Sequence, residues 1–96
     1  MNWSYMVDKI LSLDNDGKII SEVDFVKKDV STIDIKRVYV NPEFRGQGVA
    51  DKTMLTVVDY LRNYKLKAIP TCSYANSWFH KNEDKYKDLI ASDIES

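Results

Sequence analysis

Alternating apolar and polar residues predict β-structure in the first part of the chain. A strand is expected over Met6–Leu13, and Asp14–Gly17 ends it with the Asp-Gly pair that is typical of a tight hairpin. A second, half-buried strand is expected over Lys18–Lys27. Its apolar face holds Ile19, Val23 and Phe25, and its polar face holds Glu22 and Asp24. After a turn, a third strand is expected over residues 32–41.

The apolar pattern of the third strand changes phase. Its aliphatic residues form two pairs of opposite phase, Ile33 with Ile35 and Val38 with Val40. A period-two pattern that shifts by one residue indicates a β-bulge or a switch of face, here near Arg37. A strand that is buried on both faces explains the same pattern without a bulge. The pattern leaves both interpretations open.

A helical period replaces the β pattern over Gln47–Tyr64. The apolar stripe of this predicted helix consists of Ala50, Met54, Val57, Val58 and Leu61, and the solvated faces carry Asp51, Lys52, Asp59 and Arg62. Lys67–Cys72 follows as a short strand, which should lie parallel to the third strand through a right-handed crossover. A last helix is expected over Asn76–Ile90, with Trp78 and Phe79 in the core, and a frayed tail over Ala91–Ser96.

The order of these elements predicts one α+β domain over residues 1–96, in which an antiparallel β meander joins a parallel βαβ unit. No apolar run approaches the roughly 20 residues that span a bilayer. The net charge of −1 gives no general attraction to nucleic acid or to a membrane surface. With a single cysteine, Cys72, and no signal-peptide pattern, we expect a cytoplasmic protein without disulfides. One histidine, His80, gives no zinc-ligand spacing.

The segment Asn41–Ala50, "NPEFRGQGVA", lies directly before the predicted helix and holds two of the three glycines. A plain strand-to-helix turn is one interpretation. The other is an anion site, because the first N–H groups of a helix are unpaired and its dipole is positive there. Gly46 and Gly48 would leave that approach open, and Arg45 would add a positive charge. The loop lacks the Gly-Lys-Ser/Thr end of a Walker A loop and the third glycine of a dinucleotide loop.

The loop resembles the acyl-CoA-binding motif of the GNAT superfamily of N-acetyltransferases, Arg/Gln-x-x-Gly-x-Gly/Ala, often preceded by Val-x-Pro. Here Val40-Asn41-Pro42 is followed by Arg45-Gly46-Gln47-Gly48-Val49-Ala50. The order of elements over about residues 5–90 resembles the core of that superfamily. Pro70-Thr71-Cys72-Ser73-Tyr74 and Tyr86-Lys87-Asp88-Leu89 resemble signatures of its short, stand-alone branch. Glu83-Asp84 replaces the His-Pro that is common in this branch.

This resemblance implies an N-acetyltransferase that uses acetyl-CoA and an unidentified amine, such as one on a protein or peptide. The strands on either side of the helix would splay apart, and the pantetheine arm would pair with the third strand. The residues implied for CoA are Val38, Val40, Arg45, Gly46, Gln47, Gly48, Val49, Ala50 and Asn76. Cys72 is implied as an acetyl carrier or proton acceptor, and Tyr74 as the acid that protonates the thiolate. Asp24 and Asp34 are further candidate bases.

Each implied role has a plain structural alternative. Cys72 can be a small buried hydrophobe, Tyr74 a packing residue and Asn76 the N-cap of the last helix. No helices precede the strands, so the acceptor side should be open. A CoA-binding or sensing module with little turnover is therefore the second hypothesis, and a structural interaction domain is the third. We expect a monomer or weak homodimer.

Overall fold

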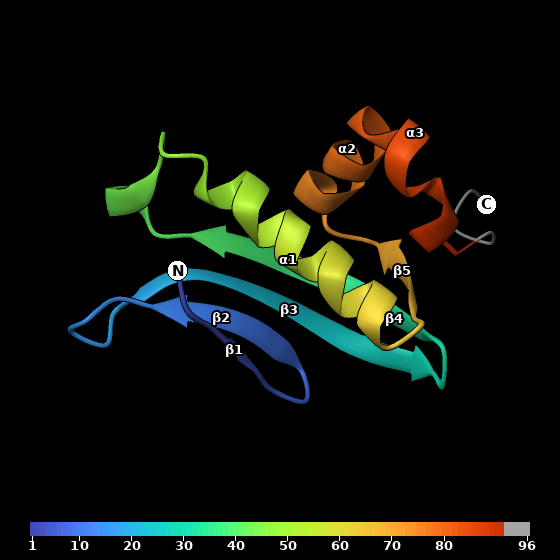
Figure 1. Ribbon diagram of the computed structural model, residues 1–96, viewed down its shortest axis with the longest axis horizontal. Helices are drawn as coiled ribbons and strands as arrows, with labels where there is room; N and C mark the ends of the chain where they lie inside the picture. The colour runs from blue at the N-terminus through green and yellow to red at the C-terminus, as the bar shows by residue number, and fades with distance from the viewer. Residues whose placement is uncertain (92–96) are drawn as a thin grey trace.

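Five strands form one sheet in the order β1-β2-β3-β4-β5, which is also their order along the chain. The computed structural model describes residues 1–91 (Figure 1). The neighbours are antiparallel from β1 to β4, whereas β4 and β5 are parallel. The strands are β1 (Trp3–Tyr5), β2 (Lys9–Leu13), β3 (Ile19–Asp29), β4 (Thr32–Val40) and β5 (Lys67–Pro70). The predicted α+β class, with a meander and a parallel βαβ unit, is confirmed.

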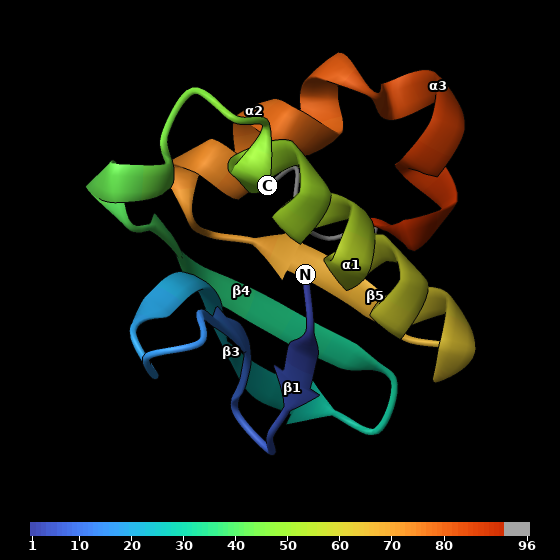
Figure 2. The ribbon, with the colours of Figure 1, turned by 60° about the vertical axis from the view of Figure 1, so that its left-hand side comes forward.

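All the α-helices lie on one face of this sheet (Figures 1 and 2). In chain order, the helical segments are η1 (Pro42–Phe44), α1 (Val49–Asn63), α2 (Ser73–Lys81), α3 (Glu83–Tyr86) and η2 (Lys87–Leu89). Among residues 1–91, no helix precedes β4 and none covers the other face of the sheet. No helix in this part of the chain is long and apolar enough to cross a membrane.

The core lies between the sheet and α1. The predicted stripe of α1 supplies four residues that are almost fully buried, Met54, Val57, Val58 and Leu61, whereas Ala50 is half-buried. From the sheet come Ile10, Val23, Phe25, Ile33 and Ile35. From α2 come Trp78 and Phe79, as the sequence predicted. Each such side chain contributes roughly 1.5–3 kcal/mol by leaving water, so this layer supplies most of the driving force for folding.

A β-bulge lies in the middle of β4. Ile35 pairs with Phe25 of β3 and Arg37 pairs with Asp24, so Lys36 is an extra residue in β4. The bulge explains the phase change that the sequence showed, because it returns Val38 to the side of the sheet on which Ile35 packs. Of the two interpretations that the sequence left open, the structure shows the bulge near Arg37 and not a strand without a bulge.

The N-terminal strand differs from the prediction. Met6–Leu13 was expected to be one strand, but residues 6–8 form a turn that separates β1 from β2. The Met6 N–H donates to the Lys9 carbonyl over 2.8 Å, and Val7 is 94% exposed. This turn contains neither glycine nor proline, and Asp8 is its only turn-favouring residue, so its sequence signal is weak. Ile19, expected on the apolar face, is 36% exposed at the start of β3.

The C-terminal helix also differs from the prediction. It begins at Ser73 and ends at Lys81, and α3 and η2 follow after a break at Asn82. Asn82 Nδ2 donates to the Trp78 carbonyl over 2.8 Å, and such local bonds compete with the helical ladder. Of the expected frayed tail, Ala91 is buried and its N–H donates to Ala68, and residues 92–96 lie outside the described part.

Candidate functional site

The strands β4 and β5 separate at a fork. Their ladder runs from Thr32↔Lys67 to Ile35↔Pro70 and then stops, two residues before the predicted end of β5 at Cys72. At the fork, the Cys72 N–H still donates to the Ile35 carbonyl over 2.9 Å. Beyond it the chain turns away into α2, while β4 continues to Val40 beside β3 alone. The second half of β4 therefore has an open edge.

Backbone groups of Val38 and Val40 lie along this open edge. The carbonyls of Ser31 and Ile35 point towards β5, since they accept from Lys67 and Cys72. The Asn41 N–H points the other way, because it donates to Ile20 of β3 over 2.9 Å. Backbone direction alternates along a strand, which directs the N–H and C=O of Val38 and Val40 to the open side. Without the bulge, residues 37 and 39 would hold these positions.

The open edge leads into the glycine loop. Gly46 has a φ of 83° and Gly48 a φ of 74°, which L side chains rarely adopt. A Cβ atom placed on either glycine would meet nothing within 4 Å, so the space in front of the loop is empty. Since Gly48 is the N-cap, α1 begins at Val49 and not at the predicted Gln47. In the described chain, no acceptor binds the N–H groups of residues 46–48.

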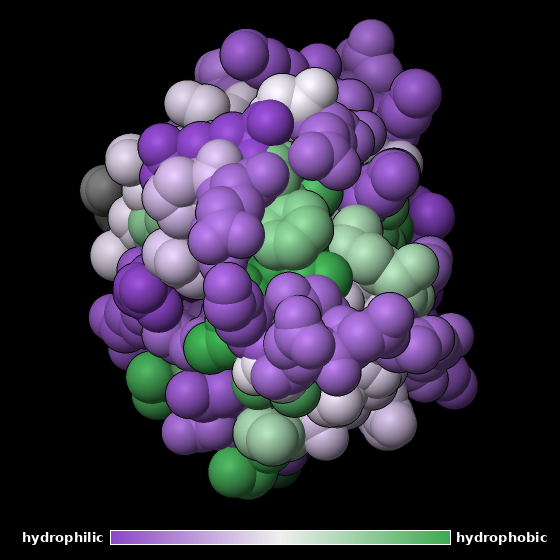
Figure 3. Space-filling model, turned by 90° about the vertical axis from the view of Figure 1, so that its left-hand side faces the viewer, coloured by the Kyte–Doolittle hydropathy of each residue, from purple (hydrophilic) through white to green (hydrophobic). Residues whose placement is uncertain are grey.

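A cavity of about 340 Å³ lies between the open edge, the loop and the first turn of α1. This volume is in the range of roughly 300–1,000 Å³ for small-molecule sites. We call the cavity the cleft; it is lined by Val38, Val40, Phe44, Arg45, Gly46, Gly48, Val49, Ala50 and Tyr74. Figure 3 faces this end of the molecule and shows hydrophobic side chains in its middle, surrounded by hydrophilic ones. The cleft thus has an apolar floor and a polar end.

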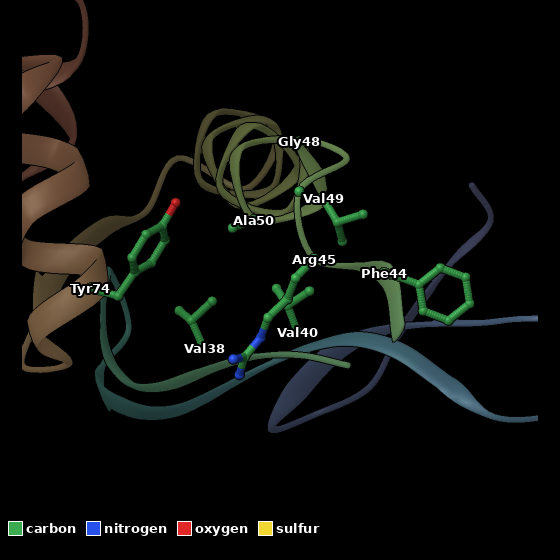
Figure 4. A pocket seen from close by; sticks show the side chains of 9 residues that line it. Val38, Val40, Phe44, Arg45, Gly48, Val49, Ala50 and Tyr74 are labelled. Carbon is green, nitrogen blue, oxygen red and sulfur yellow. The ribbon is translucent and has the colours of Figure 1, made fainter. Parts of the chain in front are cut away.

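Two polar side chains project towards the cleft from opposite sides (Figure 4). Arg45 extends from the loop towards β4, whereas Tyr74 comes from α2. Arg45 is exposed and forms no ion pair within residues 1–91. Burial, with the Asp51 carboxylate adding to it, raises the pKa of Tyr74 above its ordinary value. Tyr74 is therefore a protonated hydroxyl at neutral pH and can donate.

The candidate base Asp34 lies at the fork, and both of its carboxylate oxygens have a partner. Its Oδ1 accepts from Thr71 Oγ1 over 2.6 Å, and its Oδ2 lies 3.0 Å from Lys36 Nζ. Burial alone would raise the pKa of Asp34, but the bonds from Thr71 and Lys36 outweigh it and lower that pKa. A carboxylate held in its ionised form is a weak base. Asp34 therefore fits a structural role that links the bulge to the fork.

The other candidate base, Asp24, lies on the helix-free face of the sheet. It alternates with the core residues Val23 and Phe25, and its Oδ2 is 3.3 Å from Arg37 Nη1. Its hydrogen bond to Glu22, together with burial, raises the pKa of Glu22. Asp24 does not line the cleft, so within the described residues it is not in reach of a ligand there.

The structure brings most of the implied CoA residues together. The cleft includes Val38, Val40, Arg45, Gly46, Gly48, Val49 and Ala50. Gln47, Cys72 and Asn76 are outside its lining. Asn76 lies within α2 and is not its N-cap, a position that Cys72 holds. Asn76 Nδ2 instead donates to the Pro70 carbonyl over 3.4 Å.

Sequence reasoning missed two residues of this region. Phe44 lines the cleft, although its ring points away from the other side chains in Figure 4. Asp51 was expected on a solvated face, but its Oδ1 accepts from Trp78 Nε1 over 2.8 Å. The half-buried Cys72 packs against the core, in keeping with its structural alternative. The local sequence gives no signal for the place of Phe44 in the cleft lining or for the hydrogen bond of Asp51.

A five-stranded mixed sheet whose parallel strands fork beside a glycine loop is the arrangement of the GNAT fold, and the comparisons agree. Residues 10–89 match the family model of the GCN5-related N-acetyl-transferase. The chain belongs to this family. A GCN5-like N-acetyltransferase candidate from Staphylococcus aureus, solved by NMR, is 30% identical with a TM-score of 0.75, over 94% of this chain and 87% of that one.

More distant structures share the fold. A GNAT family N-acetyltransferase from Escherichia coli in complex with CoA is 21% identical, with a TM-score of 0.54, over 65% of this chain and 37% of that one. N-acetylglutamate synthase from Neisseria gonorrhoeae, complexed with CoA and N-acetyl-glutamate, is 14% identical, with a TM-score of 0.57, over 78% of this chain and 18% of that one. No curated protein sequence matches the chain.

Proposed function

We propose that this protein transfers the acetyl group of acetyl-CoA to an amine. The observation that carries the proposal is the open edge of β4, which ends at an empty glycine loop and the unpaired start of α1. The amides of a pantetheine arm suit the N–H and C=O groups at Val38 and Val40. The pyrophosphate suits the N–H groups from Gly46 to Ala50 together with the Arg45 charge. Family membership and the CoA-bound structures of distant relatives support this ligand.

The transfer needs few groups from the protein. The amine nitrogen attacks the thioester carbon, the C–S bond breaks, and the acetyl group ends on the nitrogen. The Val38 N–H, the first on the open edge beyond the fork, is our candidate donor to the thioester oxygen. Tyr74 gives its proton to the departing thiolate and regains one from water, and the proton that the amine loses passes to water. The raised pKa of Tyr74 favours the protonated form that this step requires.

The acceptor is proposed to be an amine on a protein or peptide. Among residues 1–91, no helix covers the face of the sheet opposite α1, so that face is accessible to an extended chain as far as helices are concerned. Cys72 has no assigned step, because it packs at the fork and does not line the cleft. Intact mass spectrometry after incubation with acetyl-CoA tests its carrier role. An acetylated Cys72 that passes its acetyl group to an amine would restore that role.

Glycine substitutions test the cleft, since the chain offers a matched control. Gly17 in the β2–β3 hairpin has a φ of 85°, and its Cβ position is as open as that of Gly48. Alanine at either position should cost about 1–2 kcal/mol of stability through backbone strain. Only Gly48→Ala should weaken CoA binding, by about tenfold or more, because its methyl group enters the space before the unpaired N–H groups. Calorimetric titration with CoA gives the affinities, and thermal unfolding gives the stabilities.

Two results of that titration would contradict the proposal. One is no binding of CoA by the wild-type protein at millimolar concentration. The other is equal affinity of Gly48→Ala and the wild type, which would place CoA elsewhere. Affinity lost equally in Gly17→Ala and Gly48→Ala would point to a general loss of the fold.

A CoA-binding module with little turnover is the second candidate. The observation that favours it is the lack of a carboxylate among the residues that line the cleft. A screen of amines and peptides with acetyl-CoA, read out by thiol release, separates the two. CoA binding without thiol release above the rate of hydrolysis would support the module. The cytoplasmic location and the monomer or weak homodimer stay predictions.

A further inference from the structure

One hydrogen bond joins α2 to the end of α1 that faces the cleft. Trp78 Nε1 donates to Asp51 Oδ1 over 2.8 Å. Asp51 is in the first turn of α1, three residues beyond the N-cap Gly48. Within residues 1–91 this is the only side-chain hydrogen bond between α1 and α2. The first turn of α1 is thus tied to α2, the helix that contributes Tyr74 to the lining of the cleft.

The indole of Trp78 is held on its remaining sides by aromatic rings. It stacks on Tyr86 with 5.4 Å between ring centroids and meets the edge of Phe79 at 5.3 Å. Trp78 is only 6% exposed, and a buried indole N–H needs a partner. Asp51 is that partner, so it fixes the orientation of Trp78. Tyr74 lies one helical turn before Trp78 on the same side of α2, and its position at the cleft follows from that of Trp78.

Asp51 stands where a negative charge opposes ligand binding. An acidic residue in the first turn favours the helix dipole, but it also repels any second anion at that end. A residue chosen for coenzyme binding alone would be neutral or basic there. The bond to Trp78 gives the carboxylate a different role, which is to link the first turn of α1 to α2.

We propose that Asp51 is a positioning residue of the cleft: through Trp78 it holds α2, and with it Tyr74, against the first turn of α1. The inference rests on the proposed binding of CoA in the cleft. Asp51 acts through Trp78 and takes no part in the chemical step. Its charge and its hydrogen bond should therefore act in opposite directions on CoA affinity.

Two substitutions of Asp51 separate these effects. Asp51→Asn keeps an oxygen that accepts from Trp78 and removes the charge, so it should bind CoA as tightly as the wild type or up to about fivefold more tightly. Asp51→Ala also loses the acceptor and should bind at least about tenfold more weakly than Asp51→Asn. Asp59→Asn makes the same charge change on an exposed part of α1 and should leave the affinity within about twofold. Calorimetric titration with CoA measures all four proteins.

A second pair of measurements tests the coupling directly. Trp78→Phe keeps an aromatic ring but lacks the N–H, and the double variant with Asp51→Ala should bind CoA no more weakly than the weaker single variant. The Trp78 indole N–H should exchange slowly with solvent in the wild type and in Asp51→Asn, and fast in Asp51→Ala. Trp3 provides a second indole signal for reference.

The outcomes distinguish this inference from the proposed function. Equal CoA affinities of Asp51→Asn and Asp51→Ala, in a wild type that binds CoA, would overturn the positioning role and leave the proposed function intact. Additive losses in the double variant, or an indole N–H that stays protected in Asp51→Ala, would do the same. A wild type that does not bind CoA would overturn both.

Discussion

The two halves of β4 lie in one strand but differ in strand pairing and in burial. The half before the bulge, Thr32–Ile35, is paired on both sides, and Ile33 and Ile35 are 2% and 0% exposed. The half after it is paired on one side only, and its residues are half-buried or exposed. One extra residue, Lys36, separates a segment that serves the core from a segment whose second backbone edge is open. A single extra residue can thus create an open edge next to a core while the side chains of Ile33 and Ile35 stay packed.

The largest expected effect contrasts Ile35 with Val38. Ile35→Ala should lower the free energy of unfolding by about 2–5 kcal/mol, because it leaves a cavity in a filled core. Val38→Ala removes methyl groups from a half-buried position and should cost about 1 kcal/mol or less. Urea denaturation monitored by circular dichroism measures both. Similar losses for the two variants would mean that the halves share one environment.

An intermediate effect concerns Asp34, whose contacts close the paired half at the fork. The folded state lowers the pKa of Asp34, so the ionised carboxylate stabilises the fold above its ordinary pKa of 3.8. That contribution should be lost as the pH falls below 3.8 and through the lower folded pKa. Asp34→Asn keeps an acceptor for Thr71 but loses the charge, and it should cost about 1–2 kcal/mol at neutral pH.

The measurement for Asp34 is the difference in unfolding free energy between the wild type and Asp34→Asn as a function of pH. The difference should be constant from neutral pH down to about pH 5 and should shrink below that value. Asp59→Asn, an exposed change of the same charge, should show less than about 0.5 kcal/mol throughout. A difference between the wild type and Asp34→Asn that grows as the pH falls would mean that folding raises the pKa of Asp34, contrary to the prediction.

The sequence could predict those features of the fold that have a local pattern. The phase change in β4, the glycine loop and the stripe of α1 are local patterns, and the structure contains the elements that they indicate. The turn at residues 6–8 was missed because it has no glycine or proline, and Asp8 alone is a weak turn signal beside the apolar Met6 and Val7. The break after α2 depends on the Asn82 side chain, which competes with the helical ladder.

Side-chain hydrogen bonds between residues far apart in the sequence had no signal. Asp51 and Trp78 are 27 residues apart, and Thr71 and Asp34 are 37 apart. Each pair meets only because β5 lies parallel to β4 and α2 folds back beside α1. An exposed aspartate on a helix has the same local pattern whether or not an indole reaches it. Such pairs appear only once the crossover has been formed in three dimensions.

The smallest expected effect on stability belongs to Arg45, at the far end of the open half. Arg45 is exposed and unpaired among the described residues, so Arg45→Ala should change the unfolding free energy by less than about 0.5 kcal/mol. It should nevertheless weaken CoA binding about three- to tenfold and reduce the dependence of that affinity on salt, since one contact to phosphate is lost. Lys52→Ala removes an exposed charge one residue beyond Asp51, outside the lining of the cleft, and should change the affinity less than about twofold. Equal losses in the two variants would mean that a diffuse positive field, and not the loop at the end of the open edge, attracts the coenzyme.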